Sequence, residues 1–224
     1  MTRRFASRRP IRLSDTDASG RLRLDAVARY LQDVASDDWL DAGFESSESV
    51  WVVRRTELTV EQPFADDGVV ALKTWCSGIA AAAASRRYSL TGDRGGRIEA
   101  ESVWIHLDRE LQPVRLPESF REVYGPSAAG HGVVTRFSLA LPPADAHSER
   151  WALRRTDEDR LGHVNNAVYW VPLEEQFGAD VRHAVLEYRK PVDVGDEALV
   201  VRDGAQLWIT VAGEVRAAAA ILAR

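Results

Sequence analysis

The chain has 224 residues, 45% of them hydrophobic, and a formal net charge of −5. That length suits one large domain or two small ones, and the hydrophobic content excludes a disordered chain. The acidic balance provides no basic field for nucleic acid, so we expect no nucleic-acid partner.

The N-terminus and the cysteine count indicate the compartment. The basic opening "MTRRFASRRPIRLS" lacks the apolar core of a signal peptide, and no span of the sequence is long enough to cross a bilayer. We interpret this opening as a frayed, solvated terminus rather than a contact for an acidic partner. The single cysteine, Cys76, excludes an internal disulfide and a cysteine metal cluster, and we expect it to be a buried small hydrophobe. These features predict a cytoplasmic protein.

Helical spacing of apolar residues predicts a first helix. Val27, Leu31 and Val34 recur on one helical face. Asp25 is a residue type that caps helix starts, and Gly43 is one that ends helices. We therefore expect a helix between these two residues.

A second helix is expected in the C-terminal half. Asn166 is a favourable N-cap, and the side chains of Tyr169, Trp170 and Leu173 can form the buried face. Pro172 lies inside this segment and should shorten or kink the helix.

The remaining segments alternate or are rich in β-branched residues, with turn residues between them. The expected strands are 57–63, 68–76, 86–92, 98–108, 183–191, 197–204, 206–213 and 214–222. We assign the alanine runs at 80–84 and 217–220 to strands as well, despite their helical propensity. Each half then combines a helix with a mostly antiparallel sheet, an α+β arrangement. The expected boundaries are 1–127 for the first half, 128–148 for a loop-like linker and 149–224 for the second half.

The two halves repeat one motif. "SDTDASGRLRLDAVARYLQDVA", from Ser14, aligns without a gap with "TDEDRLGHVNNAVYWVPLEEQF", from Thr156. The matched pairs are Asp15 with Asp157, Asp17 with Asp159, Gly20 with Gly162, Leu22 with Val164, and Leu31 with Leu173. A two-copy duplication explains this order, and a longer solenoid does not.

The second copy carries more hydrogen-bonding groups. Asp159 and His163 lie four residues apart across a glycine turn, and Asn165 and Asn166 follow. A helix start offers unpaired backbone N–H groups that polarise a carbonyl oxygen. A carboxylate and an imidazole nearby can activate water or attack directly, so this pattern suits hydrolysis of an activated acyl compound.

The first copy lacks most of these groups. Asp17 is present, but Arg21 stands where the second copy has His163, and Arg23 and Leu24 stand where it has the asparagine pair. This inequality predicts one reactive half and one half that shapes a substrate channel.

Structural roles compete with these functional ones. The aspartates of both copies could simply form Asx-turns, and the two asparagines could simply cap a helix. The remaining histidines have no ligand set near them in the sequence; they are His106, His131, His147 and His183. We therefore assign no metal and no cofactor.

The segment "DEDRLGHVNNAVYW" resembles the active-site segment of the acyl-acyl carrier protein (acyl-ACP) thioesterases of plants and bacteria. "LKTWC", "RRYSL", "ESVWIHLDRELQPVRLPESF" and "LEYRKP" resemble landmarks of the same family in the same order. The resemblance implies a tandem double hotdog, in which each half wraps a curved, mostly antiparallel sheet around a long central helix. It also implies an acyl tunnel lined mainly by the first half, and hydrolysis of a fatty acyl thioester on acyl carrier protein in fatty acid biosynthesis.

The resemblance implies roles for particular residues. The family's catalytic Asp and His fall on Asp159 and His163, and an auxiliary role falls to Asp17, Glu174 or Glu175. The oxyanion and substrate would be held near Val164, Asn165 and Asn166. The family has an Asn two residues before its His and a Glu after the "LEYR" strand, where this chain has Leu161 and Pro191.

These two departures leave three functions open. The first is an acyl-ACP thioesterase, the second an acyl-coenzyme A (acyl-CoA) thioesterase, and the third a non-catalytic binder of acyl thioesters. Basic residues that could dock an acidic carrier protein or the phosphates of coenzyme A are Arg86, Arg87, Arg154, Arg155 and Arg160. Exposed arginines are more often plain surface positions than docking residues. The sequence also leaves a homodimer open.

Overall fold

The structure is a computed structural model that describes residues 2–44, 50–65, 68–178 and 181–222. The chain divides into two compact units, Met1–Arg136 and Phe137–Arg224. The division falls within the segment 128–148 that the sequence suggests as a linker. Among the described residues, no helix is both long and apolar enough to cross a membrane.

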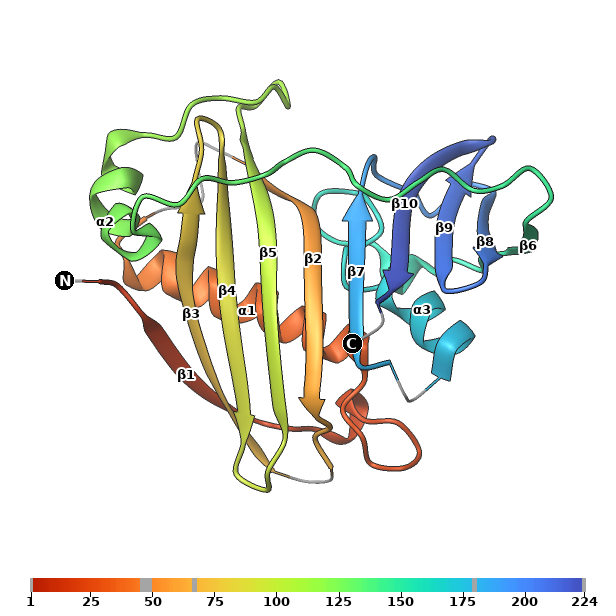
Figure 1. The fold of residues 1–224 in the computed structure, drawn as a ribbon, viewed down its shortest axis with the longest axis horizontal. Helices are drawn as coiled ribbons and strands as arrows, with labels where there is room; N and C mark the ends of the chain where they lie inside the picture. The colour runs from red at the N-terminus through yellow and green to blue at the C-terminus, as the bar shows by residue number, and fades with distance from the viewer. Residues whose placement is uncertain (1, 45–49, 66–67, 179–180, 223–224) are drawn as a thin grey trace. The chain divides into compact units, whose positions relative to one another are not determined.

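The N-terminal unit is one antiparallel sheet with two helices (Figure 1). Its elements are β1 (Phe5–Pro10), η1 (Leu13–Asp15), α1 (Leu24–Asp41), β2 (Val50–Gln62), β3 (Val69–Ile79), β4 (Ala83–Gly92), β5 (Arg97–Leu107) and α2 (Glu118–Ala128). The strand order is β1-β3-β4-β5-β2, and every pair is antiparallel. Helix α1 packs against β1 and β3, and α2 packs against β3.

Helix α1 confirms the predicted apolar face, because Val27, Leu31 and Val34 are all buried. The predicted N-cap was wrong. The helix begins at Leu24, and Asp25 lies inside its first turn, where its carboxylate accepts a hydrogen bond of 2.6 Å from Arg29. A carboxylate in the first turn still interacts favourably with the positive end of the helix dipole, although Asp25 does not cap the helix.

The basic N-terminus is ordered, which corrects the expectation of a frayed end. β1 pairs with β3 from Phe5 opposite Thr74 to Pro10 opposite Val69. The guanidinium of Arg9 lies 3.7 Å from the ring centroid of Tyr30 on α1. The cation–π contact and the main-chain pairing together hold this strand in place. Its positive charge alone had suggested a solvated terminus.

Helix α2 was not predicted, and it reaches the first residue of the expected loop-like linker, 128–148. The helix includes Pro126 and ends at Ala128. Its buried side chains Phe120, Tyr124 and Ala128 pack in one cluster with Cys76 of β3. The spacing of four residues between these side chains is a helical signal that the proline obscured.

The C-terminal unit combines five antiparallel strands with one helix (Figure 1). Its elements are β6 (His147–Arg150), η2 (Arg155–Asp157), α3 (Trp170–Phe177), β7 (His183–Tyr188), β8 (Ala198–Asp203), β9 (Gln206–Val211) and β10 (Glu214–Ile221). The strand order is β7-β10-β9-β8-β6. The alanine run 217–220 lies in β10 and is buried, as expected.

The sequence placed the start of the second helix at Asn166, but helix α3 begins four residues later, at Trp170. The reason is a tight turn formed by Asn165, whose side-chain oxygen accepts the N–H of Ala167 and whose carbonyl accepts the N–H of Val168. The predicted buried face is confirmed, since Trp170 and Leu173 are fully buried. The helix is short, with only eight residues.

The segment that leads into β6 is fixed to the C-terminal sheet. Both the N–H and the hydroxyl of Ser138 donate to the buried carboxylate of Glu187 on β7, at 2.7 and 2.8 Å. The indole N–H of Trp208 on β9 donates to the carbonyl of Ala140. These side chains give part of the expected linker a defined position on the sheet.

Candidate functional site

The two Asp-x-Asp turns share one backbone. The N–H of Asp17 donates to the carbonyl of Arg21 at 2.8 Å, and the N–H of Asp159 donates to the carbonyl of His163 at 2.9 Å. The ring is closed in each turn by a glycine N–H that donates to the aspartate carbonyl. These glycines, Gly20 and Gly162, have φ values of 79° and 81°, which other residues rarely adopt.

The first aspartate of each turn is a buried anchor. Oδ2 of Asp15 accepts the N–H of Arg12 at 3.0 Å, and Oδ2 of Asp157 accepts the N–H of Arg154 at 2.8 Å. Their exposed fractions are only 7% and 5%. Both therefore have the structural role that was weighed for this pair, and neither carboxylate is free to act on a substrate.

The second aspartate is where the turns differ. In the first turn, the carboxylate of Asp17 accepts the N–H and hydroxyl of Ser19 and the N–H and Nε–H of Arg21. Burial by itself raises the pKa of Asp17, but these hydrogen bonds outweigh it and hold the pKa below its ordinary value. A carboxylate held this way is a weak base and has little capacity left for water.

In the second turn, Asp159 is half-buried and has fewer partners. Oδ1 accepts the N–H of Leu161 at 2.8 Å, and Oδ2 accepts a longer bond of 3.3 Å from the side-chain amide of Asn165. No arginine donates either of these two hydrogen bonds, unlike in the first turn. Leu161 contributes only its backbone N–H to this carboxylate, and its apolar side chain is exposed. The carboxylate therefore keeps lone pairs for a water molecule or an acyl carbon.

His163 lies beside this carboxylate in the chain and is held by a residue that the sequence analysis missed. Its Nδ1 is 2.6 Å from Oδ1 of Asp193, thirty positions away. The only sequence signal for Asp193 is the turn-like "VDVGD" that follows the "LEYRKP" strand. Nothing in that pattern pairs it with a histidine.

The backbone after His163 offers one N–H group for an oxyanion. The N–H groups of Val164 and Asn165 already donate to the carbonyls of Val192 and Asp157, at 2.8 Å each. The N–H of Asn166 has no acceptor among the residues that the structure describes. The carbonyl of the same peptide, that of Asn165, accepts a turn bond, and a trans peptide then aims the N–H of Asn166 the opposite way.

Comparisons with known proteins identify the family. The model for the N-terminal domain of acyl-ACP thioesterases matches residues 2–124, and the model for the C-terminal domain matches residues 142–210. The chain belongs to the acyl-ACP thioesterase family. It is therefore a thioester hydrolase, which confirms the resemblance read from the sequence.

Solved thioesterases share the fold. An acyl-ACP thioesterase from Bacteroides thetaiotaomicron has a TM-score of 0.83 and 17% identity, with 98% of this chain and 97% of that chain covered. The 12:0-ACP thioesterase from Umbellularia californica has a TM-score of 0.78 and 17% identity, with coverages of 96% and 92%. These likenesses confirm the double-hotdog fold. An uncharacterised protein from Mycobacterium tuberculosis is 35% identical over 218 residues, which cover 92% of this chain and 86% of that protein.

Among the arginines considered for docking a thioesterase's carrier, Arg86 is not available. It is buried, and its guanidinium pairs with the carboxylate of Asp38 at 2.5 Å. Desolvation would lower the pKa of Arg86, but the surrounding Tyr88 and Asp38 outweigh it and raise the pKa, so the guanidinium stays charged. The remaining four arginines are exposed: Arg87, Arg154, Arg155 and Arg160.

The other residues singled out from the sequence lie outside the turn that carries Asp159. Glu174 and Glu175 are in the middle of α3, and Asp17 belongs to the N-terminal unit. Cys76 is buried as expected, and burial raises the pKa of its thiol to about 11, which makes it unreactive. Within the described ranges, no group of three or more His, Cys, Asp or Glu side chains is placed to hold a metal ion.

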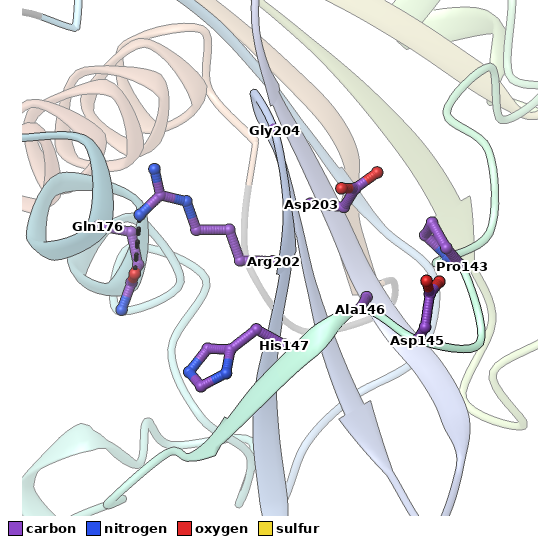
Figure 2. A pocket seen from close by; sticks show the side chains of 8 residues that line it. All are labelled: Pro143, Asp145, Ala146, His147, Gln176, Arg202, Asp203 and Gly204. Carbon is purple, nitrogen blue, oxygen red and sulfur yellow. Dashed lines mark hydrogen bonds between the residues drawn. The ribbon is translucent and has the colours of Figure 1, made fainter.

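A cavity of about 780 Å³ lies elsewhere in the C-terminal unit (Figure 2). It is lined by Pro143, Asp145, Ala146, His147, Gln176, Arg202, Asp203 and Gly204. Arg202 turns towards Gln176 and donates to its side-chain oxygen at 3.3 Å. Charged and polar groups dominate this lining, whereas a fatty acyl chain requires apolar walls. None of the lining residues belongs to the turn that carries Asp159.

Proposed function

We propose that the protein hydrolyses the thioester that joins a fatty acyl chain to acyl carrier protein and releases a free fatty acid. The observation that carries this proposal is the difference between two turns of the same backbone. Among the described residues, only the second turn has an imidazole together with a carboxylate that no arginine binds, and the segment after it supplies the N–H of Asn166, which has no acceptor there. Family membership supports the reaction class.

In the proposed reaction, Asp159 is the base. Its carboxylate takes a proton from a water molecule while the water oxygen bonds to the thioester carbonyl carbon. The N–H of Asn166 donates to the oxygen that becomes negative, which is the interaction that lowers such barriers most. Asp159 hands this proton to His163, and as the C–S bond breaks His163 passes it to the thiolate sulfur, which restores the Asp159 carboxylate. In a variant of this mechanism, the Asp159 carboxylate attacks the acyl carbon directly instead of activating water.

The two units are assigned different tasks. We assign the acyl channel to the N-terminal half, residues 1–127, and the chemistry to the C-terminal half, residues 149–224. The exposed Arg155 precedes the second turn in the chain and the exposed Arg160 lies within it, and both supply positive charge for an acidic carrier protein. The expected compartment is the cytoplasm, and a homodimer stays open.

Two other functions remain. Arginine side chains bind the phosphates of coenzyme A as well as they bind a protein carboxylate, which keeps acyl-CoA as a second carrier. Leu161 favours the third function, a non-catalytic acyl binder, because its side chain offers no polar group where the family has an Asn. Glu174 and Glu175 stay as auxiliary residues of the proposal, and Asp17 is the alternative reactive carboxylate if Asp159 does not carry the reaction.

Thiol release from a panel of acyl-ACP and acyl-CoA thioesters tests the proposal. We expect wild-type protein to turn over acyl-ACP, and Asp159→Ala to lose this turnover while its melting temperature stays unchanged. The matched control is Asp203→Ala, which removes an exposed aspartate from the same unit. Turnover of acyl-CoA without turnover of acyl-ACP would identify coenzyme A as the carrier in place of acyl carrier protein. Bound acyl thioester without turnover by the wild type would establish the binder instead.

A further inference from the structure

We propose that Asp193 is a positioning residue that fixes the tautomer and orientation of His163 in the reaction proposed above, on which this inference rests. The two side chains are 2.6 Å apart, a distance typical of a hydrogen bond with a charged partner. A carboxylate accepts only, so the ring nitrogen Nδ1 carries the hydrogen.

The backbone around Asp193 is held against the turn that carries His163. The N–H of Val164, next to His163, donates to the carbonyl of Val192, next to Asp193, at 2.8 Å. The N–H of Val192 donates to the hydroxyl of Tyr169 at 3.1 Å. Both valines are buried, with exposed fractions of 4% and 0%. The contact between imidazole and carboxylate is therefore built on two neighbouring residues with little freedom to move.

Asp193 is also fixed from its other side. Its N–H donates to the carboxylate of Asp196 at 2.9 Å, and the N–H of Asp196 donates back to the carbonyl of Asp193 at 3.0 Å. This closed turn sets the backbone dihedrals of Asp193. Its carboxylate consequently meets the ring in one geometry, unlike a pair of long side chains on a surface.

Folding stability does not explain the pair. The side chain of His163 is 40% exposed and that of Asp193 is 62% exposed, and ion pairs with such exposure add little to stability. The first turn has Arg21 at the equivalent position, and that side chain binds Asp17 within its own turn. Only the second turn has an imidazole and an external carboxylate that orients it.

The consequence is chemical. With the hydrogen on Nδ1, the neutral ring leaves the lone pair of Nε2 unprotonated, and Nε2 has no partner among the described residues. Nε2 accepts the proton that the Asp159 carboxylate has taken from the attacking water, and the charged ring is stabilised by Asp193. When the C–S bond breaks, Nε2 gives this proton to the thiolate, so the ring returns to its starting state and no proton is gained or lost.

The test combines kinetics with nitrogen-15 NMR of the imidazole. The variants are Asp193→Ala and Asp193→Glu, and the control is Glu214→Gln, which removes an exposed carboxylate of the same unit that pairs with Lys190. In Asp193→Ala we expect kcat to fall about 10- to 100-fold, part of what general acid–base catalysis contributes, with KM changed by less than about 3-fold. Asp193→Glu should recover most of this loss, and Glu214→Gln should match the wild type.

The NMR readout separates this inference from the reaction itself. We expect the neutral His163 ring to carry its hydrogen on Nδ1 in the wild type and on Nε2 in Asp193→Ala. An unchanged tautomer, an unchanged kcat in Asp193→Ala, or an equal loss in Glu214→Gln would overturn the inference. A wild type that hydrolyses no thioester would contradict the proposed function, while the tautomer would still decide whether Asp193 sets the ring.

Discussion

The turns at Asp15–Gly20 and Asp157–Gly162 follow the same backbone path, with matching hydrogen bonds and glycines of nearly equal φ. They differ in what surrounds the second aspartate. The carboxylate of Asp17 accepts hydrogen bonds from the side chains of Ser19 and Arg21. The carboxylate of Asp159 accepts them from the backbone N–H of Leu161 and the side-chain amide of Asn165. The comparison teaches that a duplicated scaffold fixes where a carboxylate lies, and that its immediate neighbours decide whether it can react.

A large effect is expected when the second turn receives the side chain of the first. His163→Arg should lower kcat by about 10²- to 10³-fold, because a guanidinium stays protonated and cannot accept a proton. An arginine there can also bind Asp159, as Arg21 binds Asp17. The reciprocal change, Arg21→His, should leave kcat within about 2-fold. Steady-state thiol release measures both, and equal losses would contradict different roles for the turns.

A smaller effect separates the two buried anchors. Asp15→Ala should cost about 2–3 kcal/mol of unfolding free energy, because it leaves the buried hydroxyl of Tyr30, now 2.6 Å from Asp15, without its acceptor. Asp157→Ala should cost about 1 kcal/mol, since its partner Arg154 is exposed and returns to water. Urea denaturation of both variants gives the comparison. A larger loss in Asp157→Ala would show that burial of the partner does not decide the cost.

The glycines should behave alike. Gly20→Ala and Gly162→Ala should each cost roughly 1–2 kcal/mol, because both place a Cβ in the left-handed region. Thermal unfolding of the two variants measures this cost. A difference between them well above their experimental error would mean that the turns do not share their backbone energetics.

The smallest effect depends on pH. The folded pKa of Asp17 lies below its unfolded value, so its carboxylate contributes stability that is fully present above about pH 4 and is lost as the pH falls through the folded pKa. Asp17→Asn should therefore lower the melting temperature at neutral pH, and the difference from wild type should narrow towards about pH 2. A constant difference across this range would assign the effect to packing rather than charge.

Local patterns in the sequence predicted much of the scaffold. The spacing of Val27, Leu31 and Val34 predicted the buried face of α1, since a helix repeats its own face. The gap-free alignment predicted two matching turns, because the Asp and Gly residues of such a turn act within a few positions.

The contact between His163 and Asp193 could not be predicted in this way. It joins residues thirty positions apart and depends on how Val192 packs against Val164, which only the folded chain determines. The order of β1 has the same kind of cause, because its backbone pairs with β3 and its Arg9 contacts Tyr30 on α1. The late start of α3 depends on a turn that Asn165 closes, which a preference for Asn at helix starts does not reveal.

The assignment of the chemistry to the second turn is tested most directly by kcat for Asp159→Asn beside Asp17→Asn on one acyl-ACP thioester. Each change removes one negative charge and keeps the shape of the side chain. We predict that Asp159→Asn lowers kcat at least about 10³-fold and that Asp17→Asn leaves it within about 2-fold. A large loss in Asp17→Asn with full activity in Asp159→Asn would contradict the assignment and place the reactive carboxylate in the first turn.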